Sequence, residues 1–160
     1  MYLEQTCPHP GTQRFDRLIR ADASCQEELA MPTPTRAVEA YVGMWNATDD
    51  SERRELAEEA LTDDAVLLYP TFEARSRDDA VALARQFHTD NPGARIEMLS
   101  GVEQHHGRVR VAWSMVLSDG SSAADGQSIG EQSEDGRLRR VTGFRNPLPI
   151  LRRGERRRFT

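Results

Sequence analysis

The sequence predicts an α+β domain in which three helices cover one face of a curved, mostly antiparallel sheet. Apolar residues recur at helical spacing in three stretches of the chain, 36–45, 51–61 and 77–90. Four strands are then expected in succession, at 95–102, 108–117, 122–132 and 138–144. Because helices come first and hairpin-linked strands come last, the helices are expected to gather on one face of the sheet.

The first helix shows the clearest periodicity, with one apolar stripe along its length. The stripe consists of Val38, Tyr41, Val42 and Trp45. Thr35 is the expected N-cap of this helix, and Ser51 is the expected N-cap of the second. The second helix is predicted to end at 62–64. The third, 77–90, is predicted to stop at the Asn-Pro-Gly sequence at 91–93.

The strand at 108–117 is the most informative one, because its side chains alternate between two very different faces. One face carries Val109, Val111, Trp113, Met115 and Leu117. The other carries Arg110, Ala112 and Ser114. The apolar face is expected either to fill a core or to form the wall of a ligand pocket. A shorter apolar strand is expected at 65–70, where Pro70 marks its end.

One face of the neighbouring strand, 122–132, holds only small residues. They are Ala124, Gly126, Ser128 and Gly130. Opposite the bulky face of 108–117, such residues leave space that either another element or a ligand would occupy. The other face is polar, which is typical of a solvated side or of a dimer surface. It carries Asp125, Gln127 and Glu131.

The chain of 160 residues has the length of one domain. Residues 1–30 are expected to be an N-terminal extension separate from the domain, with a natural start at Met31. The domain is expected to span 31–146. Residues 147–160 are expected to form a basic, solvated tail.

Composition argues against several classes of function. All 21 basic residues are arginine, which is typical of a GC-rich bacterial genome and excludes catalysis through a lysine Schiff base. The net charge of −5 gives no support to nucleic-acid binding. No apolar run approaches the roughly 20 residues of a membrane span, and no secretory signal is evident, so a cytoplasmic protein is expected. For Cys7 and Cys25, a reduced pair is favoured over a disulfide.

Seven short motifs between 36 and 146 occur in an order that is known from one family. They are YVGMWN at 41–46, ALTDD at 60–64, YP at 69–70, RDDA at 77–80, NPGAR at 91–95, HGRVRVAW at 106–113 and DGRLRRVTGF at 135–144. With these motifs the chain resembles the nuclear-transport-factor-2-like superfamily, and specifically its SnoaL-like polyketide cyclase branch. The resemblance implies a cone, in which a bent sheet wraps around a pocket that three helices close. Members include polyketide cyclases, ketosteroid isomerase, scytalone dehydratase and limonene epoxide hydrolase, so function must be argued from the site.

The resemblance also indicates candidate catalytic positions. The branch usually has an acidic residue just before the proline that ends the first strand, where this chain has Tyr69. It often has a second acid on the penultimate strand, where this chain has Ser128. Because both carboxylates are replaced, a carboxylate general base is missing. Tyr69 is instead the candidate donor to a developing oxyanion, with Ser128 or His88 assisting.

The candidate pocket residues are large side chains on the apolar faces of the predicted elements. They are Tyr41, Trp45, Phe87, Val111, Trp113, Met115 and Phe144. Ordinary core packing is the alternative for each of them, as solvent exposure is for His88. The adjacent residues His105 and His106 lack a third ligand, so no metal site is predicted.

The sequence leaves two hypotheses of function open. The first is a cofactor-free cyclase, isomerase or dehydratase that acts on a hydrophobic, oxygenated, polyketide-like substrate, with Tyr69 polarising a carbonyl. The second is a non-catalytic ligand-binding or dimerisation module, which the missing carboxylates favour. A homodimer through the sheet face is expected, because members of the superfamily commonly pair in this way. An enclosed cavity beside Tyr69 and Ser128 would support an enzyme, whereas a cavity filled by Trp113 and Phe144 would argue against one.

Overall fold

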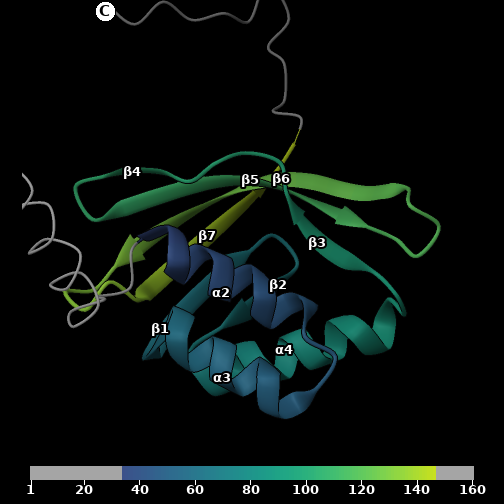
Figure 1. Ribbon diagram of the computed structural model, residues 1–160, viewed down its shortest axis with the longest axis horizontal. Helices are drawn as coiled ribbons and strands as arrows, with labels where there is room; N and C mark the ends of the chain where they lie inside the picture. Colours follow the sequence, from purple (N-terminus) through teal and green to yellow (C-terminus); the bar gives the residue numbers. More distant parts are fainter. Residues whose placement is uncertain (1–33, 147–160) are drawn as a thin grey trace, which may run out of the picture. The chain divides into compact units, whose positions relative to one another are not determined.

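The computed structural model describes residues 34–146 of the chain (Figure 1). The helices are α2 (Pro34–Asn46), α3 (Asp50–Ala60) and α4 (Arg77–Asp90). The strands are β1 (Leu61–Tyr69), β2 (Phe72–Ala74), β3 (Arg95–Met98), β4 (Glu103–His105), β5 (Arg108–Val116), β6 (Ser122–Gln132) and β7 (Leu138–Arg145). The predicted extension at 1–30, with Cys7 and Cys25, and the predicted tail at 147–160 lie outside the described residues.

The strands form one curved sheet, and the helices cover its concave face (Figure 1). The strand order is β2-β1-β7-β6-β5-β3, and β4 pairs with the first residues of β5 while β3 pairs with the last. All of these pairs are antiparallel except that of β1 with β7, which is parallel. The predicted α+β class, with a mostly antiparallel sheet and helices on one face, is confirmed.

Irregular pairing bends the sheet toward the helices. The register shifts within the pairs of β1 with β7, of β5 with β6 and of β6 with β7. A residue inserted in one strand of a pair bends that strand and increases its twist. The bends leave room between the concave face and the helices.

Two predicted helix caps are wrong. The N-cap of α3 is Asp49, whose carboxylate accepts from the backbone N–H groups of Ser51 at 2.9 Å and Glu52 at 3.0 Å. The carboxylate binds two free amides of the first turn and also carries the charge that the helix dipole favours. Thr35 lies inside α2, which begins at Pro34, because proline needs no N–H partner in a first helical turn.

The predicted boundary at 62–64 between the second helix and the first strand is also wrong. The chain enters β1 directly after α3, at Leu61, which pairs with Leu138 of β7. Both leucines are fully buried, so their pairing extends the strand toward the helix. The three-residue strands β2 and β4 were not predicted, because they are too short to show an alternating pattern.

Asn46 fixes the end of α2 against the sheet. Its Nδ2 donates to the Ile96 carbonyl at 2.8 Å, and its Oδ1 accepts from the Ile96 N–H at 2.7 Å. Ile96 belongs to the edge strand β3. The Asn46 side chain thus bonds to the free backbone edge of β3, as a neighbouring strand would. The neighbouring residue Trp45 is thereby held over the concave face.

Candidate functional site

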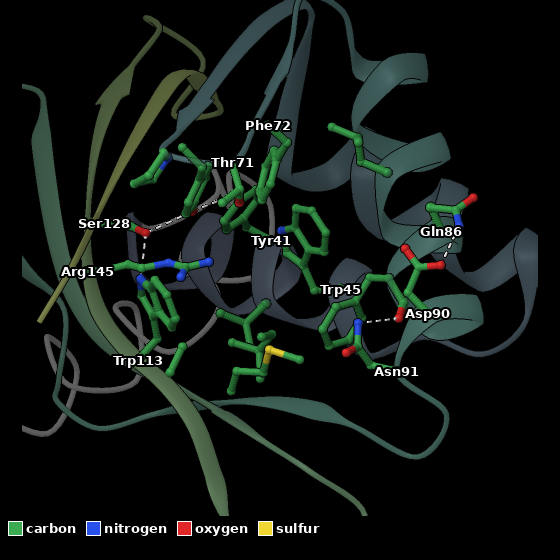
Figure 2. Close-up of a pocket in the computed structure, with 18 of the residues that line it drawn as sticks. Tyr41, Trp45, Thr71, Phe72, Gln86, Asp90, Asn91, Trp113, Ser128 and Arg145 are labelled. Atoms are coloured by element: carbon green, nitrogen blue, oxygen red, sulfur yellow. Dashed lines mark hydrogen bonds between the residues drawn. The ribbon is translucent and has the colours of Figure 1, made fainter.

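A cavity of about 450 Å³ lies between the helices and the concave face of the sheet (Figure 2). Side chains of the helices α2 and α4 and of the strands β1, β2, β3, β5, β6 and β7 line it, together with the turn that joins β1 to β2. Most of these side chains are apolar or aromatic. Pockets for small organic molecules typically have this composition and enclose about 300–1,000 Å³.

Most of the predicted pocket residues lie on the wall of this cavity. They are Tyr41, Trp45, Phe87, Val111, Trp113 and Met115. Phe144 is the exception, because its side chain is 50% exposed on the outer face of β7. Its neighbours Gly143 and Arg145 face the helices instead. The placement of Phe144 in the pocket is therefore wrong, and Phe144 does not fill the cavity.

Trp45 lies at the centre of the aromatic part of the wall. Its ring centroid is 6.3 Å from that of Tyr41 and 6.0 Å from that of Phe87, both edge to face, and 5.5 Å from that of Phe72. Phe72 also stacks on Tyr69 at 4.6 Å. Edge-to-face and offset contacts are the favoured geometries of aromatic pairs, so the rings support one another around an open space.

A chain of hydrogen bonds runs along one side of the cavity. The hydroxyl oxygen of Tyr69 lies 3.1 Å from that of Tyr41 and 2.8 Å from Oγ of Ser128. The indole Nε1 of Trp113 donates to the same Ser128 oxygen at 3.0 Å (Figure 2). Tyr69 and Ser128, two of the three candidate catalytic residues predicted from the sequence, are therefore in direct contact.

The hydrogen-bond chain of Tyr41, Tyr69 and Ser128 contains one hydroxyl hydrogen more than its internal contacts use. Three hydroxyl groups, of Tyr41, Tyr69 and Ser128, are joined by two contacts. The indole of Trp113 can only donate, so its contact with Ser128 uses none of the hydroxyl hydrogens. In every arrangement one hydroxyl hydrogen is left over, and all three hydroxyl residues line the cavity. A ligand oxygen that accepts this hydrogen would complete the chain.

Both phenols in the chain are neutral donors. Burial raises the pKa of Tyr69 above its ordinary value of 10.0, although the hydrogen bonds with Ser128 and Tyr41 act in the opposite direction. Burial, and then the nearby Tyr69, raise the pKa of Tyr41 well above the same value. Near neutral pH both phenols therefore keep their hydrogens, and neither serves as a general base.

Two glycines make room for the rings of the hydrogen-bond chain. A Cβ at Gly143 would lie 2.0 Å from Cε1 of Tyr69, and a Cβ at Gly126 would lie 2.4 Å from Cζ2 of Trp113. The rings therefore rest directly against the backbone of β7 and β6. The space left by the small face of β6 is thus taken partly by a neighbouring side chain. The residues of that face that line the cavity are Ala124 and Ser128.

Charged side chains lie on two separate parts of the wall. Gln86 Nε2 donates to Asp90 Oδ1 at 2.7 Å, and Figure 2 shows both beside Asn91 on the side away from Arg145. Asp90 and Arg145 are exposed to solvent and line the cavity. Neither was expected from the sequence, because Asp90 belongs to the helix end and Arg145 lies just beyond the predicted end of its strand.

His88 lies outside this cavity. Its Nε2 is 2.8 Å from the carbonyl oxygen of Trp45, and because a carbonyl only accepts, Nε2 carries the hydrogen. The ring lines a separate hollow together with Arg53 and Arg85. The expectation that His88 assists Tyr69 is therefore wrong. His88 instead satisfies a carbonyl in the last turn of α2.

The arrangement offers a ligand an apolar space, neutral hydroxyl donors and one exposed guanidinium. Within residues 34–146, no three His, Cys, Asp or Glu side chains are placed to hold a metal ion together. In the same part of the chain, none of the helices has the length and apolar character that a membrane crossing requires.

The similarity of this chain to known proteins lies in its fold. No family model and no curated protein matches the sequence. Among solved structures, a proposed isomerase of the SnoaL-like family from Agrobacterium tumefaciens is similar with a TM-score of 0.66 and 22% identity, over 69% of this chain and 95% of that one. An NTF2-like protein of unknown function from an Exiguobacterium species has a TM-score of 0.57 and 18% identity, over 70% and 99%. The chain has the NTF2-like fold.

A proposed polyketide cyclase from Sinorhizobium meliloti shares the NTF2-like fold, with a TM-score of 0.54 and 14% identity over 68% of this chain and 93% of that one. At these identities the likeness shows the fold alone. It confirms the cone-shaped arrangement that the sequence resemblance implied. The activity of an NTF2-like chain must still be argued from its own cavity.

Proposed function

We propose that the cavity binds an apolar, oxygenated small molecule of the polyketide type. A carbonyl oxygen of this molecule would accept the spare hydroxyl hydrogen of the Tyr41–Tyr69–Ser128 chain. The observation that supports the proposal most strongly is this spare donor on the wall of a mostly apolar cavity. A few well-placed polar groups in an apolar pocket typically determine how a small ligand is oriented.

A second candidate is cofactor-free isomerisation, cyclisation or dehydration of the same ligand. The spare hydrogen favours it, because a neutral donor shielded from water stabilises negative charge that develops on a carbonyl oxygen. Two structures with this fold are described as a proposed isomerase and a proposed polyketide cyclase. Asp90 is the only carboxylate on the wall among the described residues, and it lies away from the hydroxyl chain (Figure 2). Binding without turnover is therefore the better supported function.

Tyr69→Phe removes both contacts that orient the hydroxyls of Tyr41 and Ser128. This variant is therefore expected to weaken the binding of acetylnaphthalene roughly fivefold to tenfold and to leave the binding of ethylnaphthalene unchanged. The two probes differ by the carbonyl oxygen, and phenylalanine keeps the ring that packs on Phe72. Calorimetric titration of the purified protein measures both affinities.

In the wild type, the affinity for acetylnaphthalene is expected to stay constant between about pH 6 and pH 9, because both phenols keep their hydrogens in this range.

Thr142→Val is the matched control for this test, since it removes a hydroxyl from the outer face of β7 and keeps the shape of the side chain. Thr142 pairs with the exposed Ile129 and lies outside the cavity. This variant should bind both probes as the wild type does. Two results would contradict the proposal: neither probe binds the wild type, or Tyr69→Phe weakens both probes equally.

We also propose that the protein forms a homodimer through the outer face of the sheet. Ile129 is 39% exposed and Phe144 is 50% exposed. They lie on the adjacent strands β6 and β7, where Ile129 pairs with Thr142 and Phe144 pairs with Gln127. Large apolar side chains exposed close together are typical of protein interfaces. Size-exclusion chromatography with light scattering should give a dimer mass that Phe144→Ser shifts toward the monomer; a monomeric wild type would rule the interface out.

A further inference from the structure

Arg145 is the only cation that lines the cavity within residues 34–146. It pairs in register with Gly126, which pairs on its other side with Trp113. The three residues form one row across β7, β6 and β5. Figure 2 shows the Arg145 side chain on the same side of the cavity as Trp113 and Ser128. The guanidinium thus belongs to the wall that also carries the hydroxyl chain.

No protein group among residues 34–146 forms a hydrogen bond or an ion pair with the guanidinium of Arg145. Most other arginines in this range are paired with carboxylates, such as Arg85 with Asp50 at 2.6 Å and Arg137 with Asp135 at 2.6 Å. Arginine has five N–H donors in a fixed planar arrangement. At Arg145 these donors are available to a ligand.

We propose that Arg145 binds a carboxylate of the ligand. The ligand class is then an apolar carboxylic acid that also carries a neutral oxygen for the hydroxyl chain. This inference rests on the proposed function and adds the charged group of the ligand to it. A guanidinium matches the planar carboxylate through two parallel hydrogen bonds. A single cation on the wall fits one negative charge better than a phosphate ester, which carries close to two charges near neutral pH.

The charges on the wall also determine the orientation of such an acid. Asp90 lies away from Arg145 and is bound by Gln86 (Figure 2). With its carboxylate at Arg145, the acid directs its apolar body toward the aromatic wall around Trp45. The reverse orientation would bring the ligand carboxylate close to Asp90, and like charges at short range repel each other.

Naphthylacetate and its methyl ester test this inference, because they share an apolar body and differ in charge. The wild type should bind the acid about tenfold more tightly than the ester, and Arg145→Gln should bind the two about equally. Added salt should reduce the preference of the wild type for the acid, because an exposed ionic contact is screened. Arg140→Gln is the matched control, since Arg140 is an exposed arginine of the same strand that does not line the cavity. This control should keep the preference for the acid.

Two results would overturn the inference and leave the proposed function intact. In the first, the wild type binds acetylnaphthalene but shows no preference for the acid over the ester. In the second, Arg145→Gln keeps the full preference for the acid. If acetylnaphthalene, the acid and the ester all fail to bind the wild type, the proposed function itself fails, and the inference fails with it.

Discussion

Gly143→Ala is expected to lower the free energy of unfolding by roughly 2–3 kcal/mol, although alanine in a strand is usually the more stable residue. The new Cβ would lie 2.0 Å from Cε1 and 2.2 Å from Cδ1 of Tyr69. The ring has little freedom to withdraw, because it stacks on Phe72 and its hydroxyl is bound to Tyr41 and Ser128. The strand or the ring must therefore shift, and the hydroxyl chain should break.

Urea denaturation measures this loss, with Gly101→Ala as the control. A Cβ at Gly101 would meet nothing within 4 Å, so this change should alter the free energy of unfolding by less than about 0.5 kcal/mol. A double-mutant cycle with Tyr69→Ala isolates the clash, because Gly143→Ala should cost little once the ring is gone. A loss of equal size with and without the ring would show that the clash is not its cause.

Arg53→Ala is expected to lower the free energy of unfolding by about 2–3 kcal/mol. The side chain of Arg53 is only 3% exposed. Its Nη2 donates to the Ala47 carbonyl at 2.6 Å and its Nη1 donates to Asp50 Oδ1 at 2.9 Å. The Ala47 carbonyl follows the end of α2, where carbonyl groups lack partners within the helix. Asp50 keeps a cation in the variant, since Arg85 also binds it.

Two further variants separate burial from ion pairing. Arg53→Met should cost about 1 kcal/mol less than Arg53→Ala, because methionine refills the space of the buried arginine stem. Arg85 binds the same Asp50, but its side chain is 50% exposed, so Arg85→Met should cost less than about 1 kcal/mol. If Arg53→Ala and Arg85→Met lower the free energy of unfolding equally in urea denaturation, the burial of Arg53 is not the cause of its contribution to stability.

Local patterns predicted the order and type of the main elements. Helix α4 at 77–90 and strand β6 at 122–132 have the predicted limits, because their boundaries depend on nearby capping and turn residues. The predictions are wrong where the structure of a segment depends on a pairing partner far away in the sequence. Leu61 was expected in a helix, but pairing with Leu138, far away in the sequence, places it in a strand.

The alternation of side chains predicted the inward face of β5 but failed in β7. Counting by twos from the buried Leu138 places Phe144 on the inward face. The pairing of β7 with β6 shifts between Leu138 and Arg140, so the alternation reverses there. Val141 and Arg145 then face inward and Phe144 faces outward. Because of this one inserted residue, Arg145 lines the cavity in place of the predicted Phe144.

The sequence by itself determined the α+β class, the amphipathic stripe of α2 and the apolar face of β5, because each depends on the spacing of residues within one element. Only the tertiary structure decided which polar groups meet in the cavity. Tyr41, Tyr69 and Ser128 belong to α2, β1 and β6, with separations of 28 and 59 residues between the bonded pairs. Periodicity indicates the side toward which a residue faces. The residue that it meets there depends on how the helices pack on the bent sheet.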